Sequence, residues 1–576
     1  MANNTSSNNP VPNFYRASAA DFKKIPGSPI AYWVSERVRQ IFDEFPAIGS
    51  VANIRAGMAT GDNDKHVRLW HEVRRGNLKF DAENAGVVWA DRNYKWVPFN
   101  KGGAVRKWYG NEDYVLNYSR ESYELLKNSG NHCPSEKFYF HECLTWSDVT
   151  TGNFYVRYFP RGSVFSTVGN SIFENGIPIY SLICVLATNI TSYWLKIINP
   201  TLHANPGDVS KIPFTYTSSD EIARRISETG VGISKFDWDS YETSWDFTDL
   251  PLLRPTFRRE TLAATYAALR AHWREMTLEM QRLEEENNRI FIDAYGLQGE
   301  LTPDVPLEEI TLTCNPHYRY SNNKSEEELE TLLLADTMRE FISYAVGCML
   351  GRYSLDKPGL ILANQGETIE DYLKQVPEPT FMPDADNVIP ILDGDWFTDD
   401  IVDRFCLFLR TTFGDEHYQE NLAFLEDALG KPLRKYFLKD FYKSHVKRYK
   451  KRPIYWLFSS SKGSFNALIY MHRYTPDTAS IVLNNYLREF RVKLASRREH
   501  LEQISISGSA SSRDKTAALK EIEKLKKVME ELNTYESEIL YPLATQRLEI
   551  DLDDGVKVNY SKFGNALKKI KGLSKE

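Results

Sequence analysis

The chain has 576 residues and a mass of 66.5 kDa, which is too long for one hydrophobic core and predicts about three to four domains. Apolar residues make up 42% and aromatic residues 13%, a composition that excludes a disordered or fibrous protein. The formal net charge is −7, so a nucleic-acid-binding surface would have to come from local clusters of lysine and arginine.

Residues 1–45 are predicted to be a connector. Several prolines, up to Pro29, interrupt helices there, and Tyr32 to Phe42 is predicted to be a short helix. The Asn/Ser/Pro-rich first twelve residues lack an apolar core and do not resemble a signal peptide. Six scattered cysteines without a Cys-x-x-Cys pair indicate free thiols, so we expect a cytoplasmic protein.

Residues 46–255 are predicted to form one mixed α+β domain. Short aromatic or β-branched runs, such as Phe154 to Phe159, alternate there with Gly, Asn and Pro turns. The longest uncharged run, Asn175 to Leu195, contains Pro178 and several polar side chains that would need hydrogen-bond partners in lipid. We therefore expect a buried helix there and no membrane contact.

A long spacer helix is predicted within residues 256–298, because apolar residues recur there at alternating spacings of four and three. Gly296 is the expected stop. The positions of this seam are Leu262, Tyr266, Leu269, Trp273, Met276, Met280, Leu283 and Ile290.

Residues 299–478 are predicted to form a helical C-terminal domain. Residues 479–576 are predicted to contain two long helices joined by the polar turn Ser505 to Ser512, which makes an antiparallel hairpin that Pro542 ends. The whole chain is thus expected to be α+β and predominantly helical. The apolar seam of the hairpin is Leu483, Leu487, Phe490, Leu494, Leu501, Leu519, Ile522, Leu525, Met529, Leu532 and Ile539.

Two patterns that could carry chemistry are incomplete. His132, Cys133, His141 and Cys143 lack the paired spacing of a zinc site, and Phe138 to Phe140 between them is typical of a strand. Satisfied core and surface side chains explain these four residues, so we predict no metal. Ser459 to Ser464 has its lysine and glycine in the wrong order for a phosphate-binding loop, which favours an ordinary turn.

A polar turn at Thr60-Gly61-Asp62-Asn63, followed by Lys65 and Arg68, can bring backbone N–H groups close to a phosphate or a base edge. Taken alone, these residues also fit an ordinary solvent-exposed turn, which is the simpler interpretation.

The strongest signal is the basic segment from Lys431 to Arg452, which holds ten basic residues and one acidic residue, a formal charge of +9. Like charges on one helix face repel, and phosphates would relieve that repulsion, with an affinity that falls as salt rises. A solvated charged face is the alternative. Lysines at every fourth position predict one stripe, opposite Phe437, Phe441 and Tyr442: Lys435, Lys439, Lys443, Lys447 and Lys451.

Several longer motifs resemble known proteins. Those of the first half, in order, resemble the target-recognition domain of large adenine-specific DNA methyltransferases. Those of the second half resemble PglX, the methyltransferase of BREX phage-defence systems. The first set is Gly57–Asn63 with Val67-Arg68, Lys107–Asn111, Thr145–Ser147, Ser171–Phe173, Asn199–Leu202 and Gly207–Pro213. The second set is Ile342–Met349, Gly351–Asp356, Lys451–Phe458 and Gly463–Tyr470.

One departure from that family is clear. The family carries a catalytic domain before its recognition domain, with a glycine-bearing loop for S-adenosylmethionine and an Asn/Asp-Pro-Pro-aromatic turn that holds a flipped adenine. Both motifs are missing here, and Asn9 to Phe14 is the nearest approach to the second. The resemblance therefore implies the C-terminal portion of such an enzyme, with 1–45 as the connector, no cofactor in this chain, and no catalysis alone.

The resemblance also implies that residues 46–255 read double-stranded DNA, with the Thr60 to Asn63 turn, Lys107, Trp108 and Arg157 lining the DNA cleft. The spacer helices would brace this domain, as in type I restriction specificity subunits. Expected partners are DNA, a methyltransferase catalytic domain or subunit, and other BREX proteins. Two alternatives stay open: half of a working N6-adenine methyltransferase completed by a separate chain, and an interaction scaffold that binds acidic defence partners or phage inhibitors.

Overall fold

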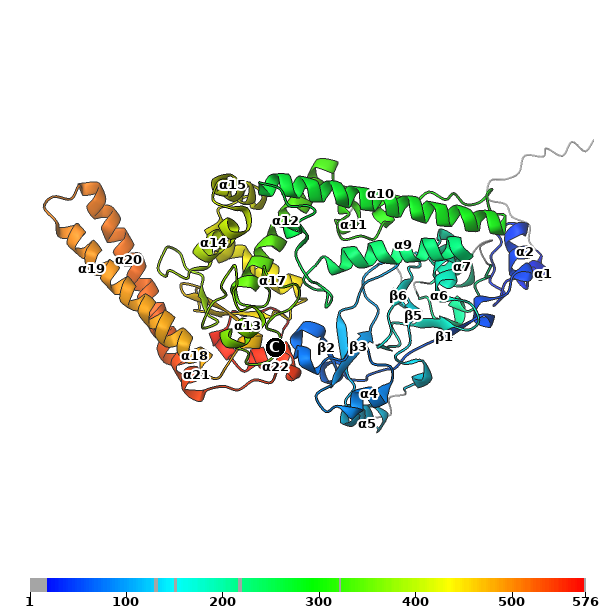
Figure 1. Ribbon diagram of the computed structural model, residues 1–576, viewed down its shortest axis with the longest axis horizontal. Coiled ribbons are helices and arrows are strands. Elements are labelled where there is room, and N and C mark those ends of the chain that lie inside the picture. Colours follow the sequence, from blue (N-terminus) through cyan, green and yellow to red (C-terminus); the bar gives the residue numbers. More distant parts are fainter. Residues whose placement is uncertain are drawn as a thin grey trace, which may run out of the picture.

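The computed structural model describes residues 18–128, 133–149, 153–201, 203–215, 220–320 and 323–573. The molecule is elongated, with two small sheets at one end, a mainly helical domain in the middle and a helical hairpin that projects from the other end (Figure 1). The predicted α+β fold, predominantly helical, is confirmed. Two short helices begin it, α1 (Ala19–Phe22) and α2 (Glu36–Glu44), and α2 starts later than predicted because Ser35 caps it.

Two four-stranded sheets form the core of the first domain. The first is antiparallel, in the order β1 (Ala52–Arg55), β8 (Ser171–Glu174), β5 (Cys143–Thr145) and β6 (Arg157–Phe159). The second has the order β2 (Val67–Leu69), β4 (Tyr114–Asn117), β3 (Trp96–Asn100) and β7 (Val164–Phe165), of which only the β3–β7 pair is parallel. The strand predicted at Phe138 to Phe140 is wrong, because Glu136–Phe138 is a 3₁₀ turn.

The uncharged run from residue 175 to 195 forms two buried helices rather than one, α6 (Ile179–Leu186) and α7 (Asn189–Ile198). Thr188 separates them, and their axes differ by 71°. Among the described residues, no single helix is both long and apolar enough to cross a membrane, and only this bent pair would be so if taken together.

The predicted spacer helix is α10 (Leu262–Tyr295), which is 34 residues long. Thr261 caps its start by accepting a hydrogen bond from the Ala264 N–H, and Gly296 ends it in the left-handed conformation with φ 71°. The apolar residues predicted for the seam are buried, except Tyr266 and Ile290, which are half-buried. The helix runs along one side of the molecule, parallel to α9 (Asp220–Asp239), and contacts both α7 and α15 (Tyr418–Leu429), so it braces the first domain against the second (Figure 1).

The C-terminal domain is less purely helical than predicted. Besides α12 (Glu326–Met349), α13 (Ile369–Gln375) and α14 (Ile401–Phe413), it holds a three-stranded antiparallel sheet in the order β10 (Tyr455–Ser459), β11 (Asn466–Tyr470) and β9 (Ile389–Pro390). Every residue of β10 and β11 is buried, so the alternation of polar and apolar residues that marks an exposed strand is absent from the sequence.

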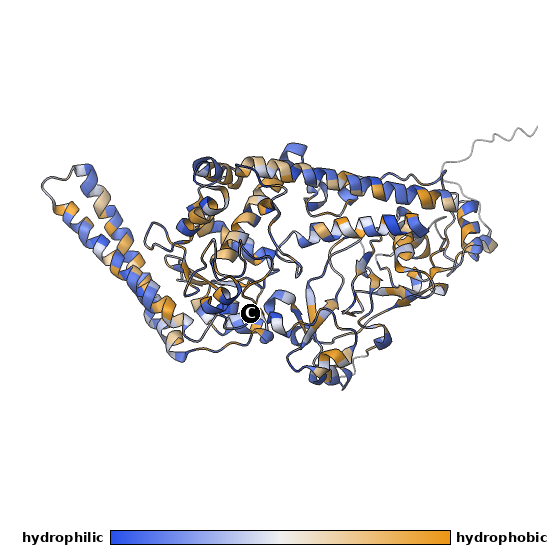
Figure 2. Cartoon of the chain, viewed as in Figure 1, coloured by the Kyte–Doolittle hydropathy of each residue, from blue (hydrophilic) through white to orange (hydrophobic). Residues whose placement is uncertain are grey.

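The predicted antiparallel hairpin is present as α19 (Glu489–Ile506) and α20 (Ser512–Thr534), and π-helical turns at Val482–Arg488 and Tyr535–Leu540 form its base. Pro542 does not end it as predicted, because proline is tolerated in the first turn of a helix and α21 (Tyr541–Gln546) continues through it. Its surface is mostly hydrophilic (Figure 2). One predicted seam position is wrong: Leu519 is 55% exposed, because Ala518 takes the buried place four residues before Ile522.

Three buried histidines lie where the first domain meets the second. The rings of His71 and His445 both pack against Tyr449, with centroid-to-centroid distances of 4.7 Å and 4.8 Å. The centroid of the His472 ring lies 4.8 Å from that of Tyr470. Burial lowers the pKa of all three imidazoles, that of His472 to about 3. Each ring is therefore neutral in the folded protein at pH values where an exposed histidine would be protonated.

The protein should lose stability as the pH falls below about 6.5, because the unfolded chain then binds protons at these histidines and the folded chain does not. Each withheld proton costs about 1.4 kcal/mol per pH unit. Urea unfolding at about pH 7.5 and about pH 5.5 measures this effect. His472→Gln should reduce the loss, whereas exposed His500→Gln should leave it unchanged. Equal pH dependence in both variants would contradict the explanation.

Candidate nucleic-acid interface

The polar turn at residues 60–63 is held in one conformation by its own side chains. Thr60 is buried and its Oγ1 donates to Asn63 Oδ1 at 2.7 Å, while Gly61 has φ 67°. Asp62 caps α3 (Asn63–His66) by accepting from the Lys65 N–H. Asn63 and Lys65 are exposed. The expectation that Thr60 itself contacts DNA is corrected: its side chain is covered, and it positions Asn63.

The turn borders a groove of about 570 Å³ between the two domains. The wall of the first domain carries Asn63, Lys101 and Arg68, and the aliphatic part of the Arg68 side chain passes Gly555. The opposite wall carries residues from the C-terminal part of the chain, between 450 and 573. The basic side chains outnumber the acidic ones. The C-terminal wall is Lys450, Arg452, Asp554, Gly555, Lys557, Val558, Ser561 and Leu573. Part of this wall is α22 (Val556–Ser561), which lies beside β2 in Figure 1.

Ion pairs fasten the two walls together. Asp64 pairs with Lys557 at 2.8 Å, and Asp113 pairs with Lys450 at 2.7 Å. A third pair joins buried Glu72 to Arg452 at 3.4 Å; burial raises the pKa of the Glu72 carboxyl. The second sheet is therefore fixed against the C-terminal domain, so a ligand in the groove would contact both at once.

The basic segment forms one continuous helix, α16 (Leu433–Tyr436), a π-helical turn (Phe437–Phe441) and α17 (Tyr442–Arg448). As predicted, Phe437, Phe441 and Tyr442 are buried. Five basic residues of the segment form ion pairs with carboxylates: Lys431, Arg434, Arg448, Lys450 and Arg452.

The other five basic residues are those of the predicted stripe, but only the first four lie on the helix: it ends at Arg448, and Lys451 follows in the left-handed conformation with φ 62°. Within the part of the chain that the structure describes, they are exposed and make no ion pair with a carboxylate: Lys435, Lys439, Lys443, Lys447 and Lys451. In an α-helix, every fourth residue drifts by about 40° around the axis. The π-helical turn has more residues per turn and offsets part of this drift, so it keeps the lysines closer to one line.

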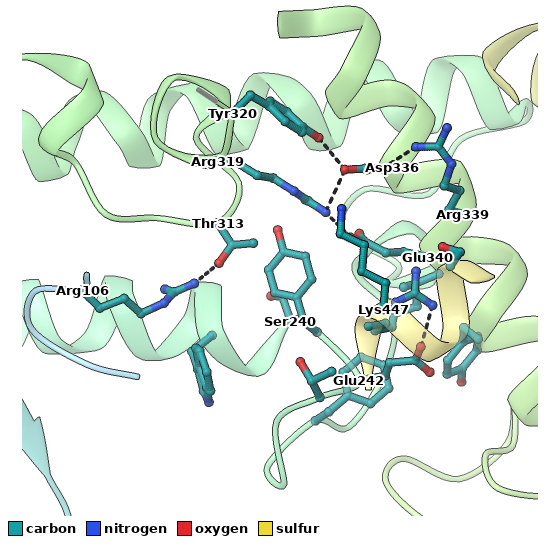
Figure 3. A pocket seen from close by; sticks show the side chains of 18 residues that line it. Arg106, Ser240, Glu242, Thr313, Arg319, Tyr320, Asp336, Arg339, Glu340 and Lys447 are labelled. Carbon is teal, nitrogen blue, oxygen red and sulfur yellow. Dashed lines mark hydrogen bonds and ion pairs between the residues drawn. The ribbon is translucent and has the colours of Figure 1, made fainter. Parts of the chain in front are cut away.

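Lys447 differs from the rest of the stripe. It lines a cavity of about 550 Å³ beside Arg319 and Glu340 (Figure 3). The arginines around it are already paired, Arg319 with Glu340 at 2.7 Å and Arg448 with Glu242 at 2.8 Å. Lys439 and Lys443 are therefore the better pair for testing the stripe.

The structure corrects the placement of three predicted DNA contacts. Lys107, Trp108 and Arg157 are only 7%, 0% and 1% exposed. The Lys107 ammonium lies 2.5 Å from Glu284 Oε2, and Trp108 Nε1 donates to Glu284 Oε1 at 3.0 Å. Glu284 belongs to α10, so Lys107 and Trp108 fasten the first domain to the spacer helix, and none of the three lines a surface that DNA could reach.

Sequence reasoning missed Glu284 and the groove cations Lys101 and Lys557. A carboxylate directly after Leu283, on the buried face of a long helix, was the available signal for Glu284. Nothing local in the sequence marks Lys101 or Lys557, because the groove exists only once the domains meet.

A metal site receives no support from the described residues, in which no three His, Cys, Asp or Glu side chains are grouped to hold an ion. His132 lies outside the described residues. The six cysteines are free thiols, as predicted.

Two curated proteins are similar to almost the whole chain, whereas no protein-family model matches it. Adenine-specific methyltransferase BrxX of Escherichia coli O9:H4 (strain HS) is 36% identical over 576 residues, 96% of this chain and 46% of that protein. Adenine-specific methyltransferase PglX of Lacticaseibacillus casei (strain Zhang) is 34% identical over 582 residues, 97% of this chain and 46% of that protein. The chain thus spans about half the length of these relatives, and the predicted resemblance to such methyltransferases is confirmed.

Proposed function

We propose that this chain is the DNA-recognition part of an adenine-specific DNA methyltransferase of the BREX phage-defence kind. In this proposal, S-adenosylmethionine and the catalytic turn belong to a separate domain or subunit, and this chain selects the site. The proposal rests on similarity to two adenine-specific methyltransferases and on one structural observation, the row of exposed lysines to which no described carboxylate is paired.

That observation favours nucleic acid over a solvated surface. Half of the basic residues in the segment 431–452 are neutralised by acidic neighbours, and the half that has no carboxylate partner among the described residues recurs at every fourth position. Phosphates along a duplex are the natural partner for such a row. In this assignment Lys435, Lys439, Lys443, Lys447 and Lys451 bind the backbone. Asn63 and Arg68, which line the groove, contact the bases together with Gly61 and Lys65 of the same turn.

The experiment is a gel-shift titration with duplex DNA at two salt concentrations. The chain should bind at low salt, and the affinity should fall linearly with the logarithm of the salt concentration. A methylation assay with the catalytic portion added should show transfer only when both are present. Absence of DNA binding at low salt would contradict the proposal and favour the interaction scaffold.

Asn63→Ala is expected to change which sequence is methylated, with little effect on overall affinity, because an amide in the groove can read an adenine edge. Sequencing of methylated DNA from the reconstituted enzyme measures the preferred site. The matched control is Asn175→Ala, at an exposed turn of the same domain. If both variants keep the original site, Asn63 does not read a base.

A further inference from the structure

A second lysine-rich segment lies at the C-terminal end of the chain. Residues 555–575 contain six lysines and no acidic residue. Two of them are used within the fold, since Lys557 pairs with Asp64 and Lys562 pairs with Asp554. Lys568 and Lys571 are exposed and make no ion pair with any described carboxylate. Such a concentration of charge near a proposed DNA groove calls for an explanation of its own.

The segment runs along the free edge of the third sheet. Leu567 forms an antiparallel bridge with Phe458 of β10, and the Lys568 N–H donates to the Leu457 carbonyl at 2.8 Å. At the end near the hairpin, the Tyr535 hydroxyl donates to the Ala566 carbonyl at 2.7 Å. The part of the segment that follows Ala566 therefore starts at the base of the hairpin.

Its other end reaches the stripe. A Cβ atom placed on Gly572 would lie 3.3 Å from the Nζ atom of Lys451, the last lysine of the basic segment. Residues 567 to 570 are extended, and a turn follows them in which the Leu573 N–H donates to the Ile570 carbonyl. An extended chain rises about 3.3 Å per residue, so this part spans about 10 Å. On each strand a duplex presents a phosphate about every 3.4 Å along its axis, so this length corresponds to about three phosphates.

Further lysines continue the same path at the hairpin base. Lys462 is exposed in the turn between β10 and β11, and a Cβ atom on the neighbouring Gly463 would lie 3.9 Å from Lys568 Nζ. Lys462 and Lys527 border the same small cavity. Neither makes an ion pair with a carboxylate in the described parts of the chain.

We propose that Lys571, Lys568, Lys462 and Lys527 form a second phosphate-binding surface, the C-terminal lysine path, which extends the stripe from Lys451 to the base of the hairpin. Its ligand is the backbone of duplex DNA outside the groove. This inference rests on the proposed function and deepens it: the chain grips flanking DNA of any sequence as well as the site that it reads.

The test uses a double variant that carries both Lys568→Glu and Lys571→Glu. Its binding is compared with that of the unchanged chain on two mixed-sequence duplexes of about 15 and about 40 base pairs. Fluorescence anisotropy at several salt concentrations gives the salt slope on each duplex, which is the decrease in the logarithm of the binding constant per unit increase in the logarithm of the salt concentration. The unchanged chain should show a steeper slope on the long duplex. In the double variant the slope on the long duplex should fall by about two and that on the short duplex should stay the same.

The matched control is Lys23→Glu with Lys520→Glu, two exposed lysines near the N-terminus and in the outer part of α20, which change the net charge equally. Both variants should unfold at the temperature of the unchanged chain, because each replaces surface side chains. An equal change on both duplexes, or none on either, overturns the inference and leaves the proposed function intact. If the unchanged chain binds neither duplex, the proposed function fails and the inference fails with it.

Discussion

Reversing two charges of the stripe, with Lys439→Glu and Lys443→Glu together, is expected to weaken binding of duplex DNA about tenfold or more at low salt and to reduce the salt slope by about two. Both side chains are exposed and have no carboxylate partner among the described residues, so the change removes only the proposed phosphate contacts and leaves no buried acid unpaired. Because phosphates carry no sequence information, the loss should be the same for every sequence.

Anisotropy titrations with several unrelated duplexes measure this loss, and Lys23→Glu with Lys520→Glu again provides the charge-matched control. The control should lower affinity slightly through net charge and leave the salt slope nearly unchanged. A loss confined to one DNA sequence would mean that the stripe reads bases, and an unchanged slope would mean that it binds no phosphate.

Glu284→Ala is expected to lower the free energy of unfolding by about 3–5 kcal/mol, because it leaves the buried Lys107 ammonium without its counter-charge. Glu284 is buried, and it accepts from both Lys107 and the Trp108 indole. Burial alone lowers the pKa of Lys107, but the Glu284 carboxylate outweighs that effect and leaves the pKa raised. Denaturant unfolding followed by tryptophan fluorescence measures the loss.

Glu279→Ala is the control on the same helix. Glu279 pairs with Arg282 at an exposed position, where an ion pair is worth about 0–1 kcal/mol. A Glu284 variant no less stable than the Glu279 variant would refute the role of the buried pair. The Glu284 variant also tests whether Lys107 and Trp108 stabilise the fold or contact DNA. Under conditions in which this variant is folded, its salt slope for DNA should match that of the unchanged chain.

Structural features that follow from a local repeat in the sequence were predicted well. The seam of α10, the hairpin and the lysines at every fourth position follow from spacing alone, since side-chain period and helix geometry determine which residues share a face. The π-helical turn within the stripe was not predicted, because it changes the hydrogen-bond pattern without changing the order of basic and apolar residues.

Contacts between distant segments explain the errors. The family resemblance implied that Lys107 and Trp108 line a DNA cleft, but both donate to a buried carboxylate 177 residues beyond Lys107. The sheet of the C-terminal domain was missed because its strands are wholly buried and therefore lack alternation. The groove joins Asn63 to Lys450 and Lys557, and no local pattern can predict a surface that two domains form together.

The most direct test is a hybrid in which this chain replaces the aligned half of the Escherichia coli BrxX methyltransferase, with the methylated sequence read by single-molecule sequencing. The hybrid should methylate the site of the protein from which the inserted chain was taken. A hybrid that is folded and active but still methylates the site of the Escherichia coli protein would contradict the claim that this chain chooses the target.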